Sequence, residues 1–172
     1  HDPNSELWHW AEQMDQTASR FPARRTPAAD ISHTAMAVNL DACIHCTRCV
    51  RACREVQVND VIGLAHRGSA SKIVFDFDDP MGDSTCVACG ECVQACPTGA
   101  LMETSLLDDR GFGLTNDLDE VHSVCPYCGV GCQVTFQVSD NRITRVEGRD
   151  GPANQGRLCV KGRFGMDYVK HP

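Results

Sequence analysis

Two cysteine-rich stretches decide the fold of this chain: CIHCTRCVRAC at residues 43–53 and CVACGECVQACP at residues 86–97. Both have the spacing C-x2-C-x2-C-x3-C, and each cysteine of the second stretch lies 43 residues after its counterpart in the first. Other residues follow the same offset, since Val50 recurs as Val93. The repeat indicates two copies of one structural unit, related by a pseudo-two-fold axis, over residues 38–105.

The spacing of the cysteines indicates iron–sulfur clusters. Three cysteines that lie three residues apart on a tight loop can bind three corners of a cubane. The fourth follows on a turn of helix that points away from this cubane, so it ligates the cluster of the other motif, as in two-cluster ferredoxins. We therefore predict one [4Fe–4S] cluster bound by Cys43, Cys46, Cys49 and Cys96, and a second bound by Cys86, Cys89, Cys92 and Cys53.

Zinc and disulfides are the alternative explanations for these cysteines. Zinc favours separate Cys-x2-Cys pairs that close a tetrahedron, and two runs of four cysteines have no natural division into such pairs. Disulfides suit short secreted chains. Here the first residues are polar and no apolar stretch follows the Arg24-Arg25 pair, so we expect a reducing compartment, the cytoplasm.

A third set of cysteines follows the repeat and begins with CPYCGVGC at residues 125–132. Its spacing alone is compatible with zinc as well as with a cluster. The glycines within it allow the backbone to approach a bulky group, and the set follows two iron–sulfur motifs. We predict a third [4Fe–4S] cluster bound by Cys125, Cys128, Cys132 and Cys159.

Composition limits both the core and the partners of the chain. Its 172 residues suffice for one or two small domains, and with aromatic residues at only 6% a large apolar core is not expected. Metal clusters would supply the missing stability. The net charge of −7 argues against nucleic acid, and no apolar run approaches the roughly 20 residues that span a membrane. Because the chain starts with His1, we expect it to be a piece of a longer protein.

The first segment of the chain has the pattern of a helix. Asp2 is placed to cap it and Pro3 suits its first position. A stripe of apolar residues follows at helical spacing, and we expect it to pack against a neighbour. This stripe comprises Leu7, Trp10, Ala11, Met14 and Ala18.

Strand patterns dominate the rest of the chain. Residues 61–64 and 72–75 read as short strands within the repeat. Apolar and polar residues alternate over 134–138, and a turn leads into 142–146, so a hairpin with one apolar face is predicted. Residues 162–170 are predicted to form a closing helix.

The fold is therefore predicted to be α+β, with a ferredoxin-like two-cluster domain followed by a small β-rich one-cluster domain. We divide the chain into a helix with its linker (1–37), the two-cluster domain (38–105), a connector (106–121) and the one-cluster domain (122–172).

The motifs resemble those of known families. The repeat resembles the bacterial two-[4Fe–4S] ferredoxin fold, although Arg54 stands where the second motif has Pro97. CPYCGVGC, together with GRLCVKGR at residues 156–163, resembles the N-terminal iron–sulfur module of molybdopterin oxidoreductases. Within that family it is most similar to the catalytic (alpha) subunit of formate dehydrogenases, and the ferredoxin-like unit before it is similar to the NAD-linked kind.

This resemblance implies a function for the chain as the electron-transfer segment of an oxidoreductase. Formate would be oxidised reversibly to CO2 at molybdenum or tungsten held by bis(molybdopterin guanine dinucleotide) in the remainder of the catalytic subunit. FMN and NAD are expected in a flavin- and NAD-binding iron–sulfur partner subunit. The resemblance places Lys161 between the third cluster and the pterin, where it can bridge electron flow, and implies no substrate-binding catalytic residue in this segment.

Two other functions remain to be weighed. The iron–sulfur subunit of respiratory NADH dehydrogenase resembles this chain in the third motif, but its two-cluster repeat is incomplete, unlike the eight repeat cysteines here. A stand-alone ferredoxin-type carrier, or a zinc module, would not need Lys161 or the run of residues around it.

Charged residues within the first motif have two explanations. Arg48, Arg51 and Arg54 either raise the reduction potential of the nearby cluster by stabilising added negative charge, or form a solvated helix face. His45 is expected to lie at the surface or behind the ligands, because its motif already has its full set of cysteines.

Overall fold

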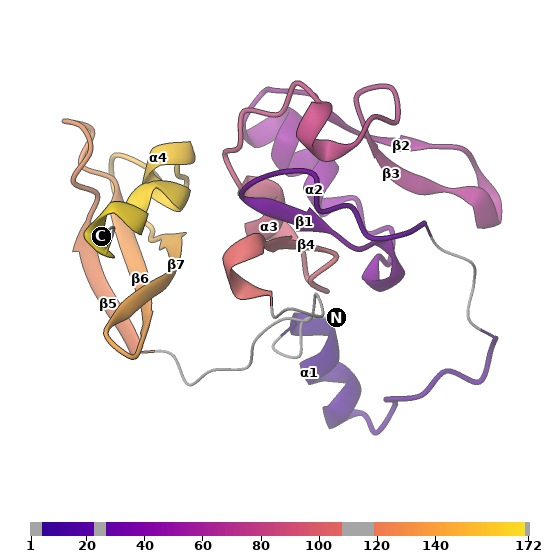
Figure 1. Cartoon of the computed structure of the whole chain (residues 1–172). Helices are drawn as coiled ribbons and strands as arrows, with labels where there is room; N and C mark the ends of the chain where they lie inside the picture. The colour runs from indigo at the N-terminus through magenta and orange to yellow at the C-terminus, as the bar shows by residue number, and fades with distance from the viewer. Residues whose placement is uncertain (1–4, 23–26, 108–118, 171–172) are drawn as a thin grey trace.

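The computed structural model describes residues 5–22, 27–107 and 119–170 (Figure 1). A first part combines short helices with two small sheets, in which β1 pairs with β4 and β2 pairs with β3. A second part consists of a three-stranded sheet in the order β5-β6-β7 and a C-terminal helix. In these described residues no helix has the length and apolar character required to cross a bilayer.

Helix α1 spans Glu6–Gln13 and begins later than the sequence indicates. Its N-cap is Ser5, whose hydroxyl accepts a hydrogen bond from the backbone N–H of Trp8 at 3.3 Å. The predicted cap at Asp2 is therefore wrong, although Asp2 and Pro3 themselves lie outside the described residues.

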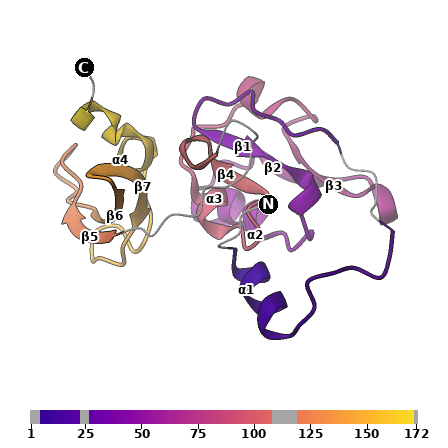
Figure 2. The same ribbon diagram turned by 60° about the horizontal axis from the view of Figure 1, so that its bottom comes forward.

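The apolar stripe of α1 is not covered by the described part of the chain. None of its residues is buried, and Trp10 and Met14 are 50% and 66% exposed. Figure 2 shows α1 at one side of the first part, away from its sheets. The helix is tethered by polar contacts: Glu6 pairs with Arg48 at 2.8 Å, and the N–H of Leu7 donates to the carbonyl of Pro97 at 3.0 Å. The neighbour expected for the stripe stays a prediction.

The two small sheets of the first part are antiparallel pairs. Strand β2 (Ile62–Ala65) pairs with β3 (Lys72–Phe75), which confirms the predicted strands to within one residue. Strand β1 (Met36–Val38) pairs with β4 (Leu101–Glu103) and closes the repeat. This second pair was not predicted, because strands of three residues are too short to show a period-two pattern.

The repeat in the sequence is also a repeat in backbone conformation. Helix α2 (Arg48–Arg51) is preceded by Thr47 at φ 59°, and helix α3 (Glu91–Ala95) by Gly90 at φ 74°. Two residues earlier, His45 and Ala88 also have positive φ, at 57° and 54°. Left-handed residues are rare unless the surroundings require them, so both loops are bent into one shape at equivalent positions.

The two motifs differ after their helices. Pro97 follows Cys96 in the second motif, and α3 ends before it with Cys96 in an extended conformation. In the first motif Arg54 stands at the corresponding position, and the chain continues as the π-helical stretch η2 (Ala52–Val56). The expected departure from the ferredoxin pattern is thus a change of helix ending.

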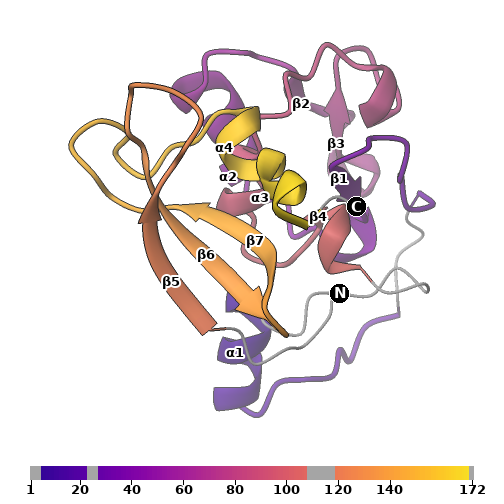
Figure 3. The ribbon, with the colours of Figure 1, turned by 60° about the vertical axis from the view of Figure 1, so that its left-hand side comes forward.

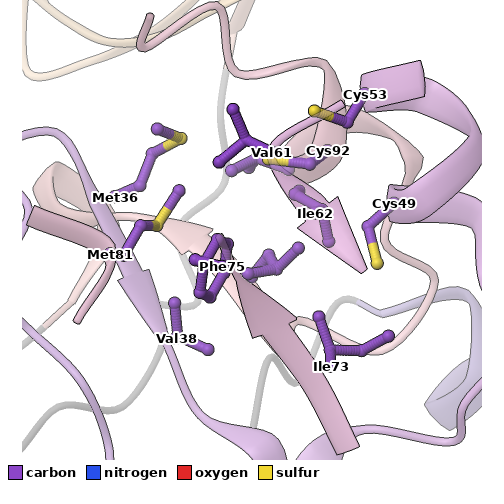
Figure 4. Close-up of a cluster of buried hydrophobic side chains, with 12 residues drawn as sticks. Met36, Val38, Cys49, Cys53, Val61, Ile62, Ile73, Phe75, Met81 and Cys92 are labelled. Atoms are coloured by element: carbon purple, nitrogen blue, oxygen red, sulfur yellow. The ribbon is translucent and has the colours of Figure 1, made fainter. Parts of the chain in front are cut away.

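The core of the first part is small and contains cysteines (Figure 4). Met36 and Met81 are fully buried, and Phe75 lies beside them. Figure 4 shows Cys53 and Cys92 together near Val61 at one edge of this core. The other buried members are Val38, Cys49, Ile62, Ile73, Val93 and Leu101.

The second part is built on the predicted hairpin. Strands β6 (Gln133–Ser139) and β7 (Arg142–Gly148) pair antiparallel with an irregularity at Gln137/Val138, and β5 (Asp119–Val124) adds to the other edge of β6. Strand β5 was not predicted, and its first residues fall in the range given as connector.

The C-terminal helix and several short turns complete the structure. Helix α4 (Val160–Phe164) begins two residues before the predicted closing helix and passes into the 3-10 stretch η6 (Gly165–Lys170). The remaining 3-10 turns are η1 (Leu40–Ala42), η3 (Gly68–Ala70), η4 (Met81–Asp83) and η5 (Thr104–Leu106).

The two parts meet through a buried carboxylate on β4. Glu103 forms an ion pair with Arg145 of β7 at 3.3 Å, and Arg145 also pairs with Glu147 at 3.0 Å. Burial raises the pKa of Glu103 to about 7, although Arg145 and Arg163 act in the opposite direction. The hydroxyl of Ser105 adds a hydrogen bond to the carbonyl of Thr144 across the same contact.

The raised pKa of Glu103 predicts a pH-dependent stability. Its ordinary value is 4.5, so between that pH and about 7 the folded protein holds a proton that the unfolded chain has lost. Raising the pH through this window therefore lowers the stability. In Glu103→Gln this loss is removed, and the variant should gain about 2 kcal/mol relative to the unsubstituted protein between about pH 5.5 and 7.5.

Anaerobic denaturant unfolding at several pH values measures this difference. Arg145 keeps Glu147 as a partner in the variant, so the comparison is not dominated by an unpaired buried guanidinium. Parallel stability curves for the two proteins would show that Glu103 ionises normally.

Candidate iron–sulfur centres

Four cysteines from the two ends of the repeat line one cavity. Cys43, Cys46 and Cys49 come from the first motif and Cys96 from the second. Apolar residues close the same cavity, including Leu40, Ile44, Ile73 and Leu101. The structure thus brings together the four residues predicted to bind the first cluster.

The electrostatics of this first site are those of thiols held close together. Burial, together with the nearby thiols of Cys96, Cys43 and Cys46, raises the pKa of Cys49 to about 12. Iron offsets this cost, because a coordinated thiol is deprotonated by the metal's positive charge. These four side chains therefore fit the donor set of an iron–sulfur cluster.

The second site gathers Cys86, Cys89 and Cys92 with Cys53 from the first motif. Cys92 is buried, and burial raises its pKa well above the ordinary value, with Cys89, Cys86 and Cys53 among the contributing neighbours. Burial likewise raises the pKa of Cys86, and Cys53 again adds to the effect. The fourth cysteine of the first motif thus faces the second site.

Backbone amides point at the first thiol of both motifs. The N–H of His45 donates to Cys43 Sγ at 3.5 Å, and the N–H of Ala88 donates to Cys86 Sγ at 3.4 Å. The left-handed conformation of these loops turns the amides inward. Hydrogen bonds to ligand sulfur raise the reduction potential of iron–sulfur clusters, so the repeat reproduces a functional detail as well as a fold.

The third site lies at one end of the β5-β6-β7 sheet. Burial raises the pKa of Cys132, and Cys125, Cys128 and Cys159 raise it further, so these four thiols are neighbours. Cys125 is buried in the small apolar core of the second part, whereas Cys128 and Cys159 are exposed. This site is open on one side in the described residues.

Asn154 positions the loop that carries Cys159, a role that sequence patterns did not reveal. Its buried side-chain amide donates to the carbonyls of Gln133, Arg149 and Arg157, and its oxygen accepts from the N–H of Gln133 at 3.0 Å. A Cβ at Gly148 would lie 2.1 Å from the carbonyl oxygen of Gly156. Both features bring the loop close to β6 and β7.

Lys161 lies in the first turn of α4, two residues after Cys159, and its side chain is exposed. The neighbouring Gly162 is buried and lies beside Cys125, since a Cβ there would be 3.6 Å from Cys125 Sγ, in ordinary van der Waals contact. The position of Lys161 next to a ligand loop is therefore defined. Its proposed contact with a pterin lies beyond the described residues.

The arginines of the first motif form exposed ion pairs. Arg48 pairs with Glu6, and Arg54 with Asp60 at 2.7 Å. Exposed pairs contribute little stability, and their charges are screened by solvent and by the partner carboxylate. This arrangement favours the solvated-face explanation for these two residues over an effect on the cluster.

Three groups of four thiols fit [4Fe–4S] clusters better than single ions. A tetrahedral zinc site needs all its ligands at about 2.3 Å from one metal. Among the described residues no group of three or more Cys, His, Asp or Glu is compact enough to hold one ion. A cubane presents four separate iron corners, so its ligands stand further apart.

Both halves of the chain match known families of iron–sulfur domains. The model of the 4Fe–4S dicluster domain matches residues 42–100, and that of the molybdopterin oxidoreductase Fe4S4 domain matches residues 118–171. The chain thus contains a region that matches the 4Fe–4S dicluster domain, followed by a region that matches the Fe4S4 domain of the molybdopterin oxidoreductases.

Its relatives are much longer oxidoreductases. "Probable oxidoreductase YjgC" of Bacillus subtilis is 31% identical over 201 residues, which cover 95% of this chain and 20% of the relative. "Putative formate dehydrogenase SH0748" of Staphylococcus haemolyticus is 28% identical over 75% of this chain and 17% of its own length. The chain therefore spans about a fifth of the curated relatives that it matches.

A solved structure shares the fold as well. In the crystal structure of an NAD+-reducing [NiFe]-hydrogenase in the H2-reduced state, 47% of one chain superposes on 67% of this chain, with a TM-score of 0.57 and 26% identity.

The exchange of fourth ligands between the two motifs is a testable prediction. Cys53→Ala should remove the cluster of Cys86, Cys89 and Cys92, because Cys53 lies among those thiols. About four of the bound irons should be lost. Iron analysis and EPR of the reduced variant measure this loss, and Cys43→Ala, which affects the other site, is the matched control. Loss of the signal that Cys43→Ala removes would mean that each motif binds its own cluster.

Proposed function

We propose that this chain is the electron-transfer segment of a pterin-dependent, NAD-linked formate dehydrogenase. One observation carries the proposal: two complete four-cysteine sites stand beside a third, within an Fe4S4 domain of the molybdopterin oxidoreductases. When bound, the clusters would supply one-electron carriers, and a pterin-held molybdenum or tungsten would supply the two-electron oxidation of formate. The relative named as a formate dehydrogenase supports this substrate.

The contacts between the two parts support an order for the three sites. Helix α4, which follows Cys159, packs on the second motif: Arg163 donates to the carbonyl of Cys89 at 2.8 Å, and the N–H of Leu158 donates to Glu91 at 3.2 Å. Figure 3 shows α4 in front of α3. The third site therefore neighbours the site of Cys86, Cys89, Cys92 and Cys53. The site of Cys43, Cys46, Cys49 and Cys96 is then last in the series.

The open side of the third site supports a contact with the remainder of a catalytic subunit. Cys128 and Cys159 are exposed, and so are the apolar side chains of Tyr127, Val130 and Val160 beside them. Exposed apolar groups around a metal centre favour a covering partner, since water would otherwise reach the cluster. The longer relatives have the chain length to supply this cover.

The partner at the other end is proposed to be a flavin- and NAD-binding subunit. The structurally similar protein is named an NAD+-reducing hydrogenase, which supports an NAD link for a segment of this shape. The complete repeat favours a formate dehydrogenase over the respiratory NADH dehydrogenase subunit. A stand-alone carrier is disfavoured by relatives several times longer than this chain.

Iron content and reduction by formate together test the proposal. The full-length protein, purified anaerobically, should contain about twelve irons in this segment in addition to any elsewhere, and formate should reduce the EPR-active clusters. Bound zinc in place of iron would refute the cluster assignment. Clusters that dithionite reduces but formate does not would refute the substrate.

Lys161 provides a second test, because the proposal places it between the third cluster and the pterin. Lys161→Ala in the full-length protein should slow cluster reduction by formate roughly tenfold, equivalent to about 1.4 kcal/mol in the barrier, while iron and pterin content stay unchanged. Lys161→Arg should have a smaller effect because the charge is kept, although the planar guanidinium is longer. Stopped-flow absorbance follows the reduction. An unaltered rate in Lys161→Ala would make this residue an ordinary surface lysine.

A further inference from the structure

Arg163 is a charged residue that the fold buries almost completely. It is 2% exposed and lies in α4 at the contact between the two parts. Its Nη2 donates at 2.8 Å both to the carboxylate of Glu91 and to the side-chain oxygen of Gln94. A charge this buried is retained only where it is paired and hydrogen-bonded. These contacts hold the Arg163 side chain in one defined position.

The same residue connects ligand loops of two different sites. Its Nε donates to the carbonyl of Cys89 at 2.8 Å, and its backbone N–H donates to the carbonyl of Cys159 at 3.1 Å. Cys89 belongs to the second site and Cys159 to the third. Arg163 thus connects the two loops: its side chain is hydrogen-bonded to one and its backbone N–H to the other.

Neighbouring residues leave the space that this connection needs. A Cβ at Gly90 would lie 2.1 Å from Cδ of Arg163, and Gly90 has a φ of 74°. The side chain of Arg163 therefore passes directly over the glycine between Cys89 and Glu91. Glu91 adds a parallel link, because the oxygen that receives Arg163 also accepts the N–H of Leu158, next to Cys159.

We infer that Arg163 is a positioning residue for electron transfer, which fixes the separation of the second and third clusters and joins their ligands by hydrogen bonds. This inference rests on the proposed clusters. It also assigns a charge effect: the guanidinium stabilises an electron added to the second site, while the paired Glu91 opposes it. The positioning effect and the charge effect can be separated by choice of substitution.

Three variants of the full-length, cluster-containing protein separate the positioning effect of Arg163 from its charge effect. Arg163→Met removes the side-chain hydrogen bonds and the positive charge, and keeps the backbone hydrogen bond to the carbonyl of Cys159. Arg163→Lys keeps the charge but cannot hold three acceptors in a planar fork. Arg163→Met combined with Glu91→Gln removes both buried charges, so that no carboxylate is left unpaired. Arg142→Met is the matched control, since Arg142 is an exposed arginine at the start of β7 in the second part.

Two EPR measurements are made on each variant: the magnetic interaction between the reduced second and third clusters, which reports their separation, and the midpoint potential of the second cluster. The interaction should be weakened or lost in all three Arg163 variants and kept in Arg142→Met. The potential should fall in Arg163→Met and return towards its original value in the double variant.

The outcomes distinguish this inference from the proposed function. If the unsubstituted protein lacks about twelve irons in this segment, the cluster assignment itself fails. If the clusters are present and the interaction is unchanged in Arg163→Lys and in the double variant, Arg163 does not position them and the inference is overturned. Should Arg163→Met fail to fold, these other two variants decide the question.

Discussion

The structure depends on one constraint: twelve thiols must be held in three groups inside a protein with very little apolar core. Burial raises the pKa of Cys49, Cys86, Cys89 and Cys92, and neighbouring thiols add to the effect. Without a metal these groups would stay protonated, and the core would contain weakly packed sulfur. Bound iron would favour the thiolate form of these side chains, because coordination stabilises the negative charge. The metal–sulfur bonds would then contribute to the stability of the fold. The predicted exchange of Cys53 and Cys96 between the motifs would bind the two short repeats into one unit.

The contact between the two parts depends on buried ion pairs rather than on thiols. It includes an apolar contact of Phe164 with the core of the first part, and it relies on two buried pairs: Glu91 with Arg163, and Glu103 with Arg145. Such pairs contribute less stability than an apolar contact of similar size, but breaking one partner is costly because the other charge remains buried. These pairs therefore select one arrangement of the two parts, but add little to the stability of their contact. A defined arrangement matters here because electron transfer depends on the distance between centres, and Glu91 and Arg163 both lie beside predicted ligands.

Sequence patterns predicted the elements of this fold that are specified by residues close together in the chain. The offset of 43 residues revealed the repeat, alternation revealed the β6-β7 hairpin, and β-rich runs revealed β2 and β3. Strands β1 and β4 escaped because they are three residues long and pair across most of the first part. The cap at Ser5 was missed because Asp2 and Pro3 offered a stronger local signal. Arg163, Glu91 and Glu103 could not be recognised either, since each looks like an ordinary surface charge until residues from a distant segment bury it.

Helix α4 unites what the sequence and the structure each reveal. Its two cations, Lys161 and Arg163, are two residues apart, which on a helix of about 100° per residue places them on nearly opposite faces. Lys161 is exposed, and Arg163 is buried against the second motif. A single turn of helix beside Cys159 therefore presents one positive charge outward, where the proposed pterin-bearing part of the protein would lie, and another inward, towards the next cluster. One helix next to Cys159 therefore carries both the residue proposed to face the pterin and the residue proposed to set the distance to the second site.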